Sequence, residues 1–555
     1  MVPGVLNIDA SALDYAIIAI YFVVVLGIGF GARRLIKDDA DFFLSGRSLP
    51  AWVTGLAFVS ANLGALEILG MAANGVSYGT AIFHFYWIGA VPAMIFLALV
   101  MMPFYYVSKV RSVPEYLKRR FDWKPHVVNA ATFAVGTILI SGVNLFALGL
   151  VLSAMLGWSI TLAIIVAAAI VLTYITLGGL SSAIYNEVLQ FFIIVAALLP
   201  LTIVGLIDVG GIGGLADKMR ESSLGDAGLH AWQGLKVGGV TNPIGANWIQ
   251  LVFGLGFVLS FGYWTTNFAE VQRTLSARNL SAARRTPLIG AYPKIFIPFI
   301  VVVPGFIALV TVKGLGSSSN PDLAANNAIP LLIQNYLPSG MIGLAVTGLL
   351  AAFMAGVAAN VSAFNTVVTY DIYQAYVRRD ASPQHYVTFG RWATVGGIAI
   401  SIMTAFIAKG YSNIMDYIQL LFSYFNAPLF ATFLLAMFWK RTTAWGAATG
   451  LVMGTVGAAV THYLVSTGTL KFGSPQAADM TGAGVAFAVD IVVTVAVTLF
   501  TRPEPESKLG GLVHGLADTD AAVEAAERDS VWWRSPALLA GGAIVLIVIL
   551  NIVFI

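Results

Sequence analysis

The stretch SANLGALEILGM, residues 60–71, places an amide and a carboxylate inside an otherwise apolar segment. The amide is Asn62, the carboxylate is Glu67, and apolar residues continue on both sides. Ionisable side chains inside membrane helices are costly to bury, so they commonly line a binding site or an ion pathway. If this segment crosses a membrane, the two side chains predict a polar site at its middle.

The composition indicates that the segment does cross a membrane. The chain of 555 residues is 58% hydrophobic and 10% charged, whereas soluble domains carry about 25% charged residues. Apolar runs long enough to span a bilayer recur along almost the whole chain. Because the runs are continuous rather than short and alternating, they indicate helices and not a β-barrel. The predicted class is an all-α polytopic membrane protein.

Several classes of function are disfavoured by what the chain lacks. There is no cysteine, so disulfides, thiolate metal ligands and a cysteine nucleophile are excluded. The six histidines stand singly, without the spacing of metal ligands. The net charge of +3 gives no indication of nucleic-acid binding, and no constellation of residues suggests an enzyme. We expect no cofactor. The first apolar run is too long for a cleavable signal peptide and ends in Arg33 and Arg34.

Hydropathy predicts about fourteen transmembrane helices. They lie near residues 10–31, 52–78, 80–107, 127–156, 158–178, 183–207, 247–270, 287–313, 338–376, 386–408, 413–439, 443–466, 481–501 and 535–555. Two long loops remain, 208–246 and 502–534. The second contains ADTDAAVEAAERDS, which is typical of a polar helix or a disordered linker.

Positive charge predicts the orientation of these helices. Basic residues gather in alternate loops: Arg33, Arg34, Lys37 and Arg47; Lys109, Arg111, Lys118, Arg119, Arg120 and Lys124; Arg273, Arg278, Arg284 and Arg285; Arg378 and Arg379; Lys440 and Arg441. The positive-inside rule places these loops in the cytoplasm. We therefore expect an integral protein of the plasma (inner) membrane with both termini on the extracytoplasmic side.

Two spans have the pattern of helices broken at the bilayer midplane. In the first, Gly64 and Gly70 flank Glu67; in the second, GLGFVLSFGYWTTNFAE (254–270), glycines precede an aromatic and polar patch. Inverted repeats in membrane proteins often begin with such discontinuous helices. Because five spans separate the two segments, they predict two inverted five-helix repeats.

Several motifs resemble one known family. They are FFLSGRSLPAW (42–52), VPEYLKRRF (113–121), EVQRTLSARN (270–279), NTVVTYDIY (365–373) and FWKRTTAWGAATG (438–450). In this order they are similar to the solute:sodium symporter family, with the closest likeness to its sodium/glucose cotransporter branch. The resemblance implies a leucine-transporter-like fold with extra flanking helices. It also implies secondary active symport by alternating access of a small polar solute, with a sugar as the leading candidate and Na⁺ as the coupling ion. The expected partners are that solute, the cation and the lipid bilayer.

The spans and the resemblance together divide the chain into seven parts. These are a first helix and cytoplasmic loop (1–51), the first repeat (52–207), an extracellular loop (208–246), the second repeat (247–439), two accessory helices (440–501), a cytoplasmic linker (502–534) and a last helix (535–555).

The resemblance also implies the residues of a solute site. The matching positions are Asn62, Glu67, Tyr86, Tyr263, Trp264, Lys294 and Gln419. Amide, carboxylate and ammonium groups can satisfy the hydroxyls around a pyranose, and an aromatic ring can cover its face. Glucose-type members carry Glu where this chain has Tyr86, and Gln or His where it has Glu67. We interpret this as a carboxylate moved across the pocket, where Glu67 binds the solute or carries a proton.

The ion site implied by the resemblance departs from the family in a second way. Carbonyls of Ser60, Leu63 and Ala352 match sodium ligands, whereas Ala355 and Gly356 stand where the family has two hydroxyls. Sodium needs several oxygen ligands at short range, so the loss leaves the shell incomplete. Glu187 matches a family aspartate nearby, and its longer carboxylate is predicted to ligate Na⁺ or to titrate as a proton carrier.

Less specific interpretations stay open at this point. Glu67 and Lys294 can form a structural ion pair, and Glu187 can extend to water from a helix end. At the level of function, the alternatives are H⁺-coupled or uncoupled transport of a monocarboxylate, an amino acid or another solute. A sensor derived from a transporter is a further alternative, although the 502–534 loop is short for a signalling domain.

Overall fold

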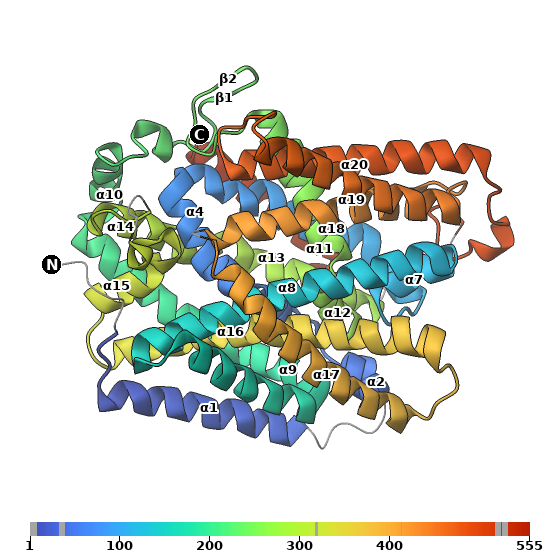
Figure 1. The fold of residues 1–555 in the computed structure, drawn as a ribbon, viewed down its shortest axis with the longest axis horizontal. Coiled ribbons are helices and arrows are strands. Elements are labelled where there is room, and N and C mark those ends of the chain that lie inside the picture. The colour runs from blue at the N-terminus through green and yellow to red at the C-terminus, as the bar shows by residue number, and fades with distance from the viewer. Residues whose placement is uncertain (1–7, 33–38, 317–319, 412, 517–522, 524–530) are drawn as a thin grey trace.

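Long apolar helices form almost all of the structure, a computed structural model, and run roughly side by side (Figure 1). It describes residues 8–32, 39–316, 320–411, 413–516, 523 and 531–555. Three of the loop cations, Arg33, Arg34 and Lys37, lie outside the described residues, as does nearly all of the ADTDAAVEAAERDS segment.

The elements follow one another with short connections. In the first half they are α1 (Ala12–Ala32), α2 (Asp39–Leu44), η2 (Ser45–Arg47), α3 (Ala51–Asn62), η3 (Leu66–Gly70), α4 (Met71–Tyr78), η4 (Gly79–Phe83), η5 (Phe85–Ala90), α5 (Val91–Phe96), η6 (Leu97–Met101), α6 (Met102–Val107), α7 (Val113–Arg120), α8 (Trp123–Leu156), α9 (Ile160–Asp208), α10 (Gly211–Arg220), η7 (Asp226–Leu229), β1 (Leu235–Lys236) and β2 (Gly239–Val240). In the second half they are η8 (Gln250–Ser260), α11 (Phe261–Thr266), α12 (Phe268–Leu275), α13 (Leu280–Val301), α14 (Val303–Thr311), η9 (Pro321–Leu323), η10 (Ala325–Asn327), α15 (Ala328–Tyr336), α16 (Met341–Thr366), η11 (Val367–Val377), α17 (Pro383–Ala408), α18 (Ile414–Phe438), α19 (Ala444–Ser466), α20 (Pro475–Phe500), η12 (Glu506–Lys508), η13 (Trp532–Arg534) and α22 (Pro536–Val553).

The helices account for the predicted spans. Among the described residues, eleven helices are long and apolar enough to cross a membrane, and two further spans are bent pairs of helices. The remaining predicted span, 158–178, corresponds to the shorter apolar helix Ile160–Thr176. It joins the next span within α9 through a bend at Gly179, whose φ is 53°. A side chain there would meet the carbonyl oxygen of Phe42 at 2.6 Å, so the bend needs glycine.

Both predicted broken helices are broken in the structure. Ala51–Asn62 and Leu66–Phe83 meet at an angle of 58°, and Gln250–Thr266 and Phe268–Leu275 at 50°. The first break follows from Leu63, whose ψ of 45° lies outside the helical range. At the second break, the side chain of Asn267 accepts a hydrogen bond from the Ala269 N–H at 3.0 Å and starts the new helix. The breaks lie where the glycine and polar patterns predicted them.

The most buried span runs through the middle of the bundle. This span is Met341–Val377, formed by α16 and η11. In its most apolar stretch 89% of the residues are buried, compared with 28% for α1 and 22% for α22. Figure 1 shows α1 at one edge of the bundle and α19 and α20 at the opposite edge. The apolar outer faces of these edge helices are exposed in the described part of the chain, so lipid is their natural solvent.

Both ends of the described chain lie at one face of the bundle. Near the start, the Ile8 N–H donates to the carbonyl of Ala154 at 2.9 Å, beside the loop after the fourth span. Near the end, the carbonyl of Phe554 accepts from the Ala231 N–H at 3.2 Å, in the loop after the sixth span. This loop, 208–246, contains α10, η7 and the antiparallel pair β1–β2. Since both loops follow even-numbered spans, the two ends share a face, as an even number of spans requires.

Candidate functional site

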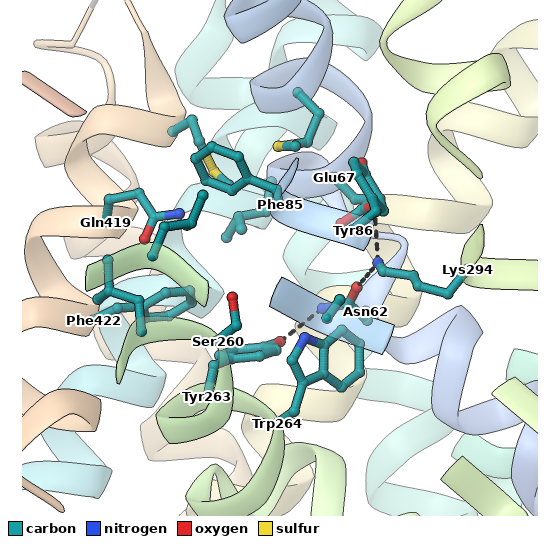
Figure 2. A pocket seen from close by; sticks show the side chains of 16 residues that line it. Asn62, Glu67, Phe85, Tyr86, Ser260, Tyr263, Trp264, Lys294, Gln419 and Phe422 are labelled. Carbon is teal, nitrogen blue, oxygen red and sulfur yellow. Dashed lines mark hydrogen bonds and ion pairs between the residues drawn. The ribbon is translucent and has the colours of Figure 1, made fainter. Parts of the chain in front are cut away.

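A small cavity lies where the two broken helices meet α13 and α18 (Figure 2). Its volume is about 60 Å³. All seven residues predicted for the solute site line this cavity. Its complete lining is Asn62, Leu66, Glu67, Met71, Phe85, Tyr86, Ala90, Leu255, Leu259, Ser260, Tyr263, Trp264, Lys294, Met415, Gln419 and Phe422.

An ion pair forms one wall of the cavity. The ammonium nitrogen of Lys294 lies 2.9 Å from Glu67 Oε1, and the two side chains are only 2% and 7% exposed. The same ammonium donates to Asn62 Oδ1. It also lies 5.2 Å from the ring centres of Tyr86 and Trp264. Each cation–π contact of a desolvated ammonium contributes up to about 2 kcal/mol. The buried charge of Lys294 is therefore matched from several sides.

A chain of hydrogen bonds continues from this ion pair into the second broken helix. Asn62 Nδ2 donates to the Tyr263 hydroxyl at 2.9 Å, and that hydroxyl donates to Glu270 Oε1 at 2.7 Å. Tyr263 precedes the break at Asn267 and Glu270 follows it, so the tyrosine connects both halves of this helix to the first broken helix. The two discontinuous helices are linked by side chains as well as by packing.

The opposite wall carries groups that are available to a solute. Gln419 Oε1 is buried and has no hydrogen-bond partner among the described residues. Figure 2 shows Gln419 across the cavity from Lys294, with Phe422 and Ser260 below it. The Phe422 ring lies 4.7 Å from that of Tyr263, centre to centre. The cavity thus offers an unpaired carbonyl oxygen and aromatic faces opposite a neutralised ion pair.

Ser60 and Leu63, two of the residues predicted for the ion site, lie beside the break of the first broken helix, where this helix touches α16. A side chain at Gly64 would approach Gly356 Cα within 3.5 Å, so the backbone break beside Ser60 and Leu63 packs directly on α16, which carries Ala352. The Ser60 carbonyl already accepts a hydrogen bond from the Leu63 N–H at 3.0 Å and keeps a second lone pair.

The space next to Gly356 is filled by an asparagine from α8. A side chain on Gly356 would collide with Asn144 Oδ1, and so would one on Gly64. Asn144 Oδ1 accepts from the Ala65 N–H at 2.8 Å, and its Nδ2 donates to the carbonyl of Ile140 at 3.1 Å. The amide of Asn144 therefore occupies the volume that a serine at position 356 would need.

The structure places Glu187 in an ion pair. Arg273 donates from Nε to Glu187 Oε2 at 3.2 Å and from a terminal nitrogen to Oε1, and both side chains are fully buried. Another terminal nitrogen of Arg273 donates to the carbonyl of Ala269 at 2.7 Å. The pair joins α9 to α12, so Glu187 does not extend to water from a helix end.

Three functional candidates escaped the sequence analysis: Asn144, Glu270 and Arg273. Glu270 follows Asn267 by three residues, which is the spacing of an exposed acid in the first turn of a helix. In the structure Glu270 is only 2% exposed, and the spacing alone did not indicate this burial. Arg273 was counted only as a loop cation. The rule that ionisable groups inside membrane segments have buried partners or functions is the signal that could have found both.

Comparison with known proteins decides the family. The sequence profile described as the sodium:solute symporter family matches residues 42–454. The chain belongs to this family. The symporter is 30% identical over 464 residues to a sodium/glucose cotransporter of Vibrio parahaemolyticus, covering 80% of this chain and 83% of that one. It is 28% identical over 551 residues to sodium/glucose cotransporter 1 of Oryctolagus cuniculus, covering 92% and 82%.

Solved structures confirm the fold. A Na⁺-coupled sialic acid symporter in a substrate-bound outward-open state matches with a TM-score of 0.74 at 18% identity, covering 89% of this chain and 99% of that one. A nucleobase-cation-symport-1 family transporter in a closed conformation matches with a TM-score of 0.51 at 15% identity, covering 88% and 99%. The predicted leucine-transporter-like fold is therefore confirmed. Family and relatives make the protein an ion-coupled secondary transporter in a membrane, not an enzyme.

Proposed function

We propose that this symporter carries a neutral sugar together with Na⁺ by alternating access. The observation that carries the proposal is the charge balance of the cavity. Among the described residues, its charged lining side chains are Glu67 and Lys294 alone, and they neutralise each other at 2.9 Å. An uncharged solute leaves that balance intact, whereas a carboxylate solute would have to compete with Glu67 for Lys294. Amide groups and aromatic faces around the pair suit a ring with hydroxyls on its rim.

The proposed roles of the lining residues follow from their positions. Asn62, Glu67, Lys294 and Gln419 bind hydroxyls, while Tyr86 and Trp264 cover C–H faces and flank the ammonium. Tyr263 closes the path toward the basic face of the bundle. A cavity of about 60 Å³ is far smaller than the hundreds of cubic ångströms of an ordinary ligand pocket, so the helices must separate to admit a sugar. Opening the links through Tyr263 is the proposed gating step.

The identity of the solute is tested by measuring uptake into proteoliposomes that contain the full chain. D-Glucose, D-galactose, L-lactate and a set of neutral amino acids are supplied under Na⁺ and pH gradients that are imposed separately. We expect concentrative uptake of a sugar under the Na⁺ gradient. Uptake of lactate or of an amino acid in preference to every sugar would overturn the solute assignment, and uptake that follows only the pH gradient would replace Na⁺ by H⁺.

For the ion, we propose that Asn144 compensates for the hydroxyls missing at Ala355 and Gly356. Sodium is a hard cation that prefers oxygen ligands. The Asn144 amide oxygen lies against both Gly64 and Gly356, next to the backbone that carries the Ser60 and Leu63 carbonyls. This assignment replaces the direct ligation by Glu187 that the sequence suggested, since Arg273 holds both oxygens of that carboxylate. In this assignment Glu187 affects coupling indirectly, because its ion pair with Arg273 holds the second broken helix in position.

The ion assignment is tested by the Na⁺ dependence of uptake. Asn144→Leu keeps the volume and removes the oxygen, and we expect the half-saturating Na⁺ concentration to rise at least about tenfold, as for the loss of one buried polar ligand. Asn144→Asp keeps an oxygen and should retain high affinity. Asn129→Leu is the matched control, since Asn129 is also buried on α8 but lies about 22 Å away along the helix axis. An unchanged Na⁺ dependence in Asn144→Leu would exclude Asn144 as a ligand.

We also propose that the face with the basic loops is cytoplasmic and that both termini are extracytoplasmic, in the plasma (inner) membrane. The positive-inside rule supports this orientation. Cysteines introduced singly at Arg378 and at Lys236, in a chain that has no cysteine of its own, should be labelled by a membrane-impermeant maleimide from opposite sides.

A further inference from the structure

A basic pocket lies far from the solute cavity, at the face of the bundle that is opposite the chain ends. It is formed by α7, the start of α8 and η11, and its volume is about 490 Å³. Four basic side chains line it, Arg111, Lys118, Arg119 and Arg379, against two acids, Glu115 and Asp371. The pocket therefore has an excess of positive charge.

The two acids are already engaged by other groups. Arg119 donates to Glu115 Oε1 from Nε at 3.0 Å and from a terminal nitrogen at 2.6 Å. The backbone N–H of Arg111 donates to Glu115 Oε2 at 2.6 Å. Asp371 Oδ1 lies 2.8 Å from His126 Nε2. A further Arg119 nitrogen donates to the carbonyl of Ser108, and Arg111 donates to Gln374 Oε1 at 3.3 Å. Both of these partners are neutral.

Two of the basic side chains have no carboxylate partner in the described parts of the chain. Lys118 lies 5.5 Å from the centre of the Tyr376 ring, and Arg379 donates from Nε to the carbonyl of Ala375 at 3.2 Å. Both side chains are exposed and border the pocket. Their charges are available to an anion that enters it.

An apolar groove adjoins the basic pocket. The groove lies between α8 and α19, has a volume of about 360 Å³, and is lined by Trp123, Lys124, Val127, Val128, Trp445, Ala448, Thr449, Val452 and Met453. Trp123 lines both the groove and the pocket. Trp123 and Trp445 are 57% and 55% exposed, as expected of tryptophans at a membrane interface. A basic pocket thus passes directly into an apolar groove on the membrane-facing surface.

We propose that this pocket and groove form one binding site for an anionic glycerophospholipid. The phosphate-containing headgroup lies among Lys118, Arg119 and Arg379, and an acyl chain follows the groove past Trp123. Basic pockets between helices on the cytoplasmic side are suited to anionic headgroups. The groove is the reason for choosing a lipid over a free phosphate, since a soluble anion would leave it unused. A bound lipid would connect α7 and α8 to η11, the end of the central span that carries the ion site.

The test measures lipid binding to the full chain in delipidated detergent micelles. Native mass spectrometry gives the dissociation constants of dioleoyl phosphatidylglycerol and of dioleoyl phosphatidylcholine. The wild type is expected to prefer phosphatidylglycerol. A basic residue near a headgroup contributes about fivefold in affinity, so Lys118→Gln with Arg379→Gln should weaken phosphatidylglycerol binding about thirtyfold.

The matched control is Arg378→Gln with Arg441→Gln, which removes the same charge from exposed positions on the same face outside the pocket. It should bind phosphatidylglycerol as the wild type does. Trp123→Ala should weaken both lipids, because it removes the surface shared with the acyl chain. Glycerol 1-phosphate, which has the headgroup chemistry without the chains, should not displace the lipid at equal concentration.

Three outcomes would overturn the proposal. Equal weakening in the control would indicate general surface charge, equal affinity for phosphatidylcholine would remove the role of the basic groups, and displacement by glycerol 1-phosphate would assign the pocket to a soluble phosphate. The unfolding midpoint of each variant in detergent identifies one that does not fold, in which case Lys118→Gln alone replaces the double variant.

Discussion

The ion pair between Glu67 and Lys294 can be separated experimentally into its structural and its solute-binding parts. The perturbation is a pair of near-isosteric changes, Glu67→Gln and Lys294→Met, made singly and together. Both side chains are almost fully buried, so either single change leaves an uncompensated charge inside the bundle. Breaking a buried pair in this way costs about 3–5 kcal/mol of unfolding free energy.

The structure ranks the two single variants. In Glu67→Gln, the ammonium keeps Asn62 Oδ1 and two aromatic faces, so the loss should lie near 3 kcal/mol. In Lys294→Met, the Glu67 carboxylate keeps no cation and lies near the Tyr86 hydroxyl, so the loss should approach 5 kcal/mol. The double variant removes both charges and should be more stable than Lys294→Met alone.

The assay is reversible unfolding in mixed micelles, combined with binding of the transported sugar. If Glu67 and Lys294 also bind the solute, the double variant recovers stability but does not recover binding, which stays about ten- to a hundredfold weaker. Stability losses that simply add would refute the coupling between the two charges. Sugar binding that returns with stability would make the pair purely structural.

Three further predictions concern other parts of the molecule. Tyr263→Phe should slow uptake by losing the two hydrogen bonds of the hydroxyl, and Tyr263→Ala should impair it more by also removing the ring; equal losses would assign the whole effect to the hydroxyl. Glu187→Gln should abolish concentrative uptake but retain counterflow exchange, because it releases Arg273 on the second broken helix; concentrative uptake that persists would exclude Glu187 from coupling. Burial lowers the pKa of His84, which stands between the helices Leu66–Phe83 and Phe85–Val107 and contacts the 208–246 loop through Ala231, from 6.5 to about 4. The unfolded chain then binds the proton first as the pH falls, so about 2 kcal/mol of stability present above pH 6.5 is lost by pH 5. His84→Gln should remove this part of the pH dependence of thermal unfolding, and identical profiles would contradict the assignment.

Hydropathy and glycine patterns were sufficient to predict the architecture. The spans, the breaks near Gly64 and Asn267, and the family all followed from sequence, because each depends on residues close together in the chain. A helix needs a run of about twenty apolar residues to cross a bilayer, and a break needs a local interruption of that run. Such signals do not require knowledge of what packs against them.

The residues expected to bind the solute lie together in the structure, and their role in binding stays a prediction. All seven residues expected from the resemblance line one cavity, including Gln419 and Tyr86. Ser260 and Phe422 line it too, but neither differs from ordinary helix residues in the sequence. The ordinary types of these two side chains explain why they were not predicted.

Pairing was decided only by the tertiary structure. Sequence analysis left Glu67 with Lys294 as one alternative among several, and it left Glu187 free to reach the ion site. In the folded chain Glu187 pairs with Arg273, 86 positions away, and Lys294 binds Asn62, 232 positions away. Asn144 fills the space left by Gly356 from a third helix. Helical periodicity determines which face of a helix carries a polar group, but the partner of a buried charge depends on which helices pack together. In a medium of low dielectric constant, that partner determines whether the charge can bind an ion, a solute or only its neighbour.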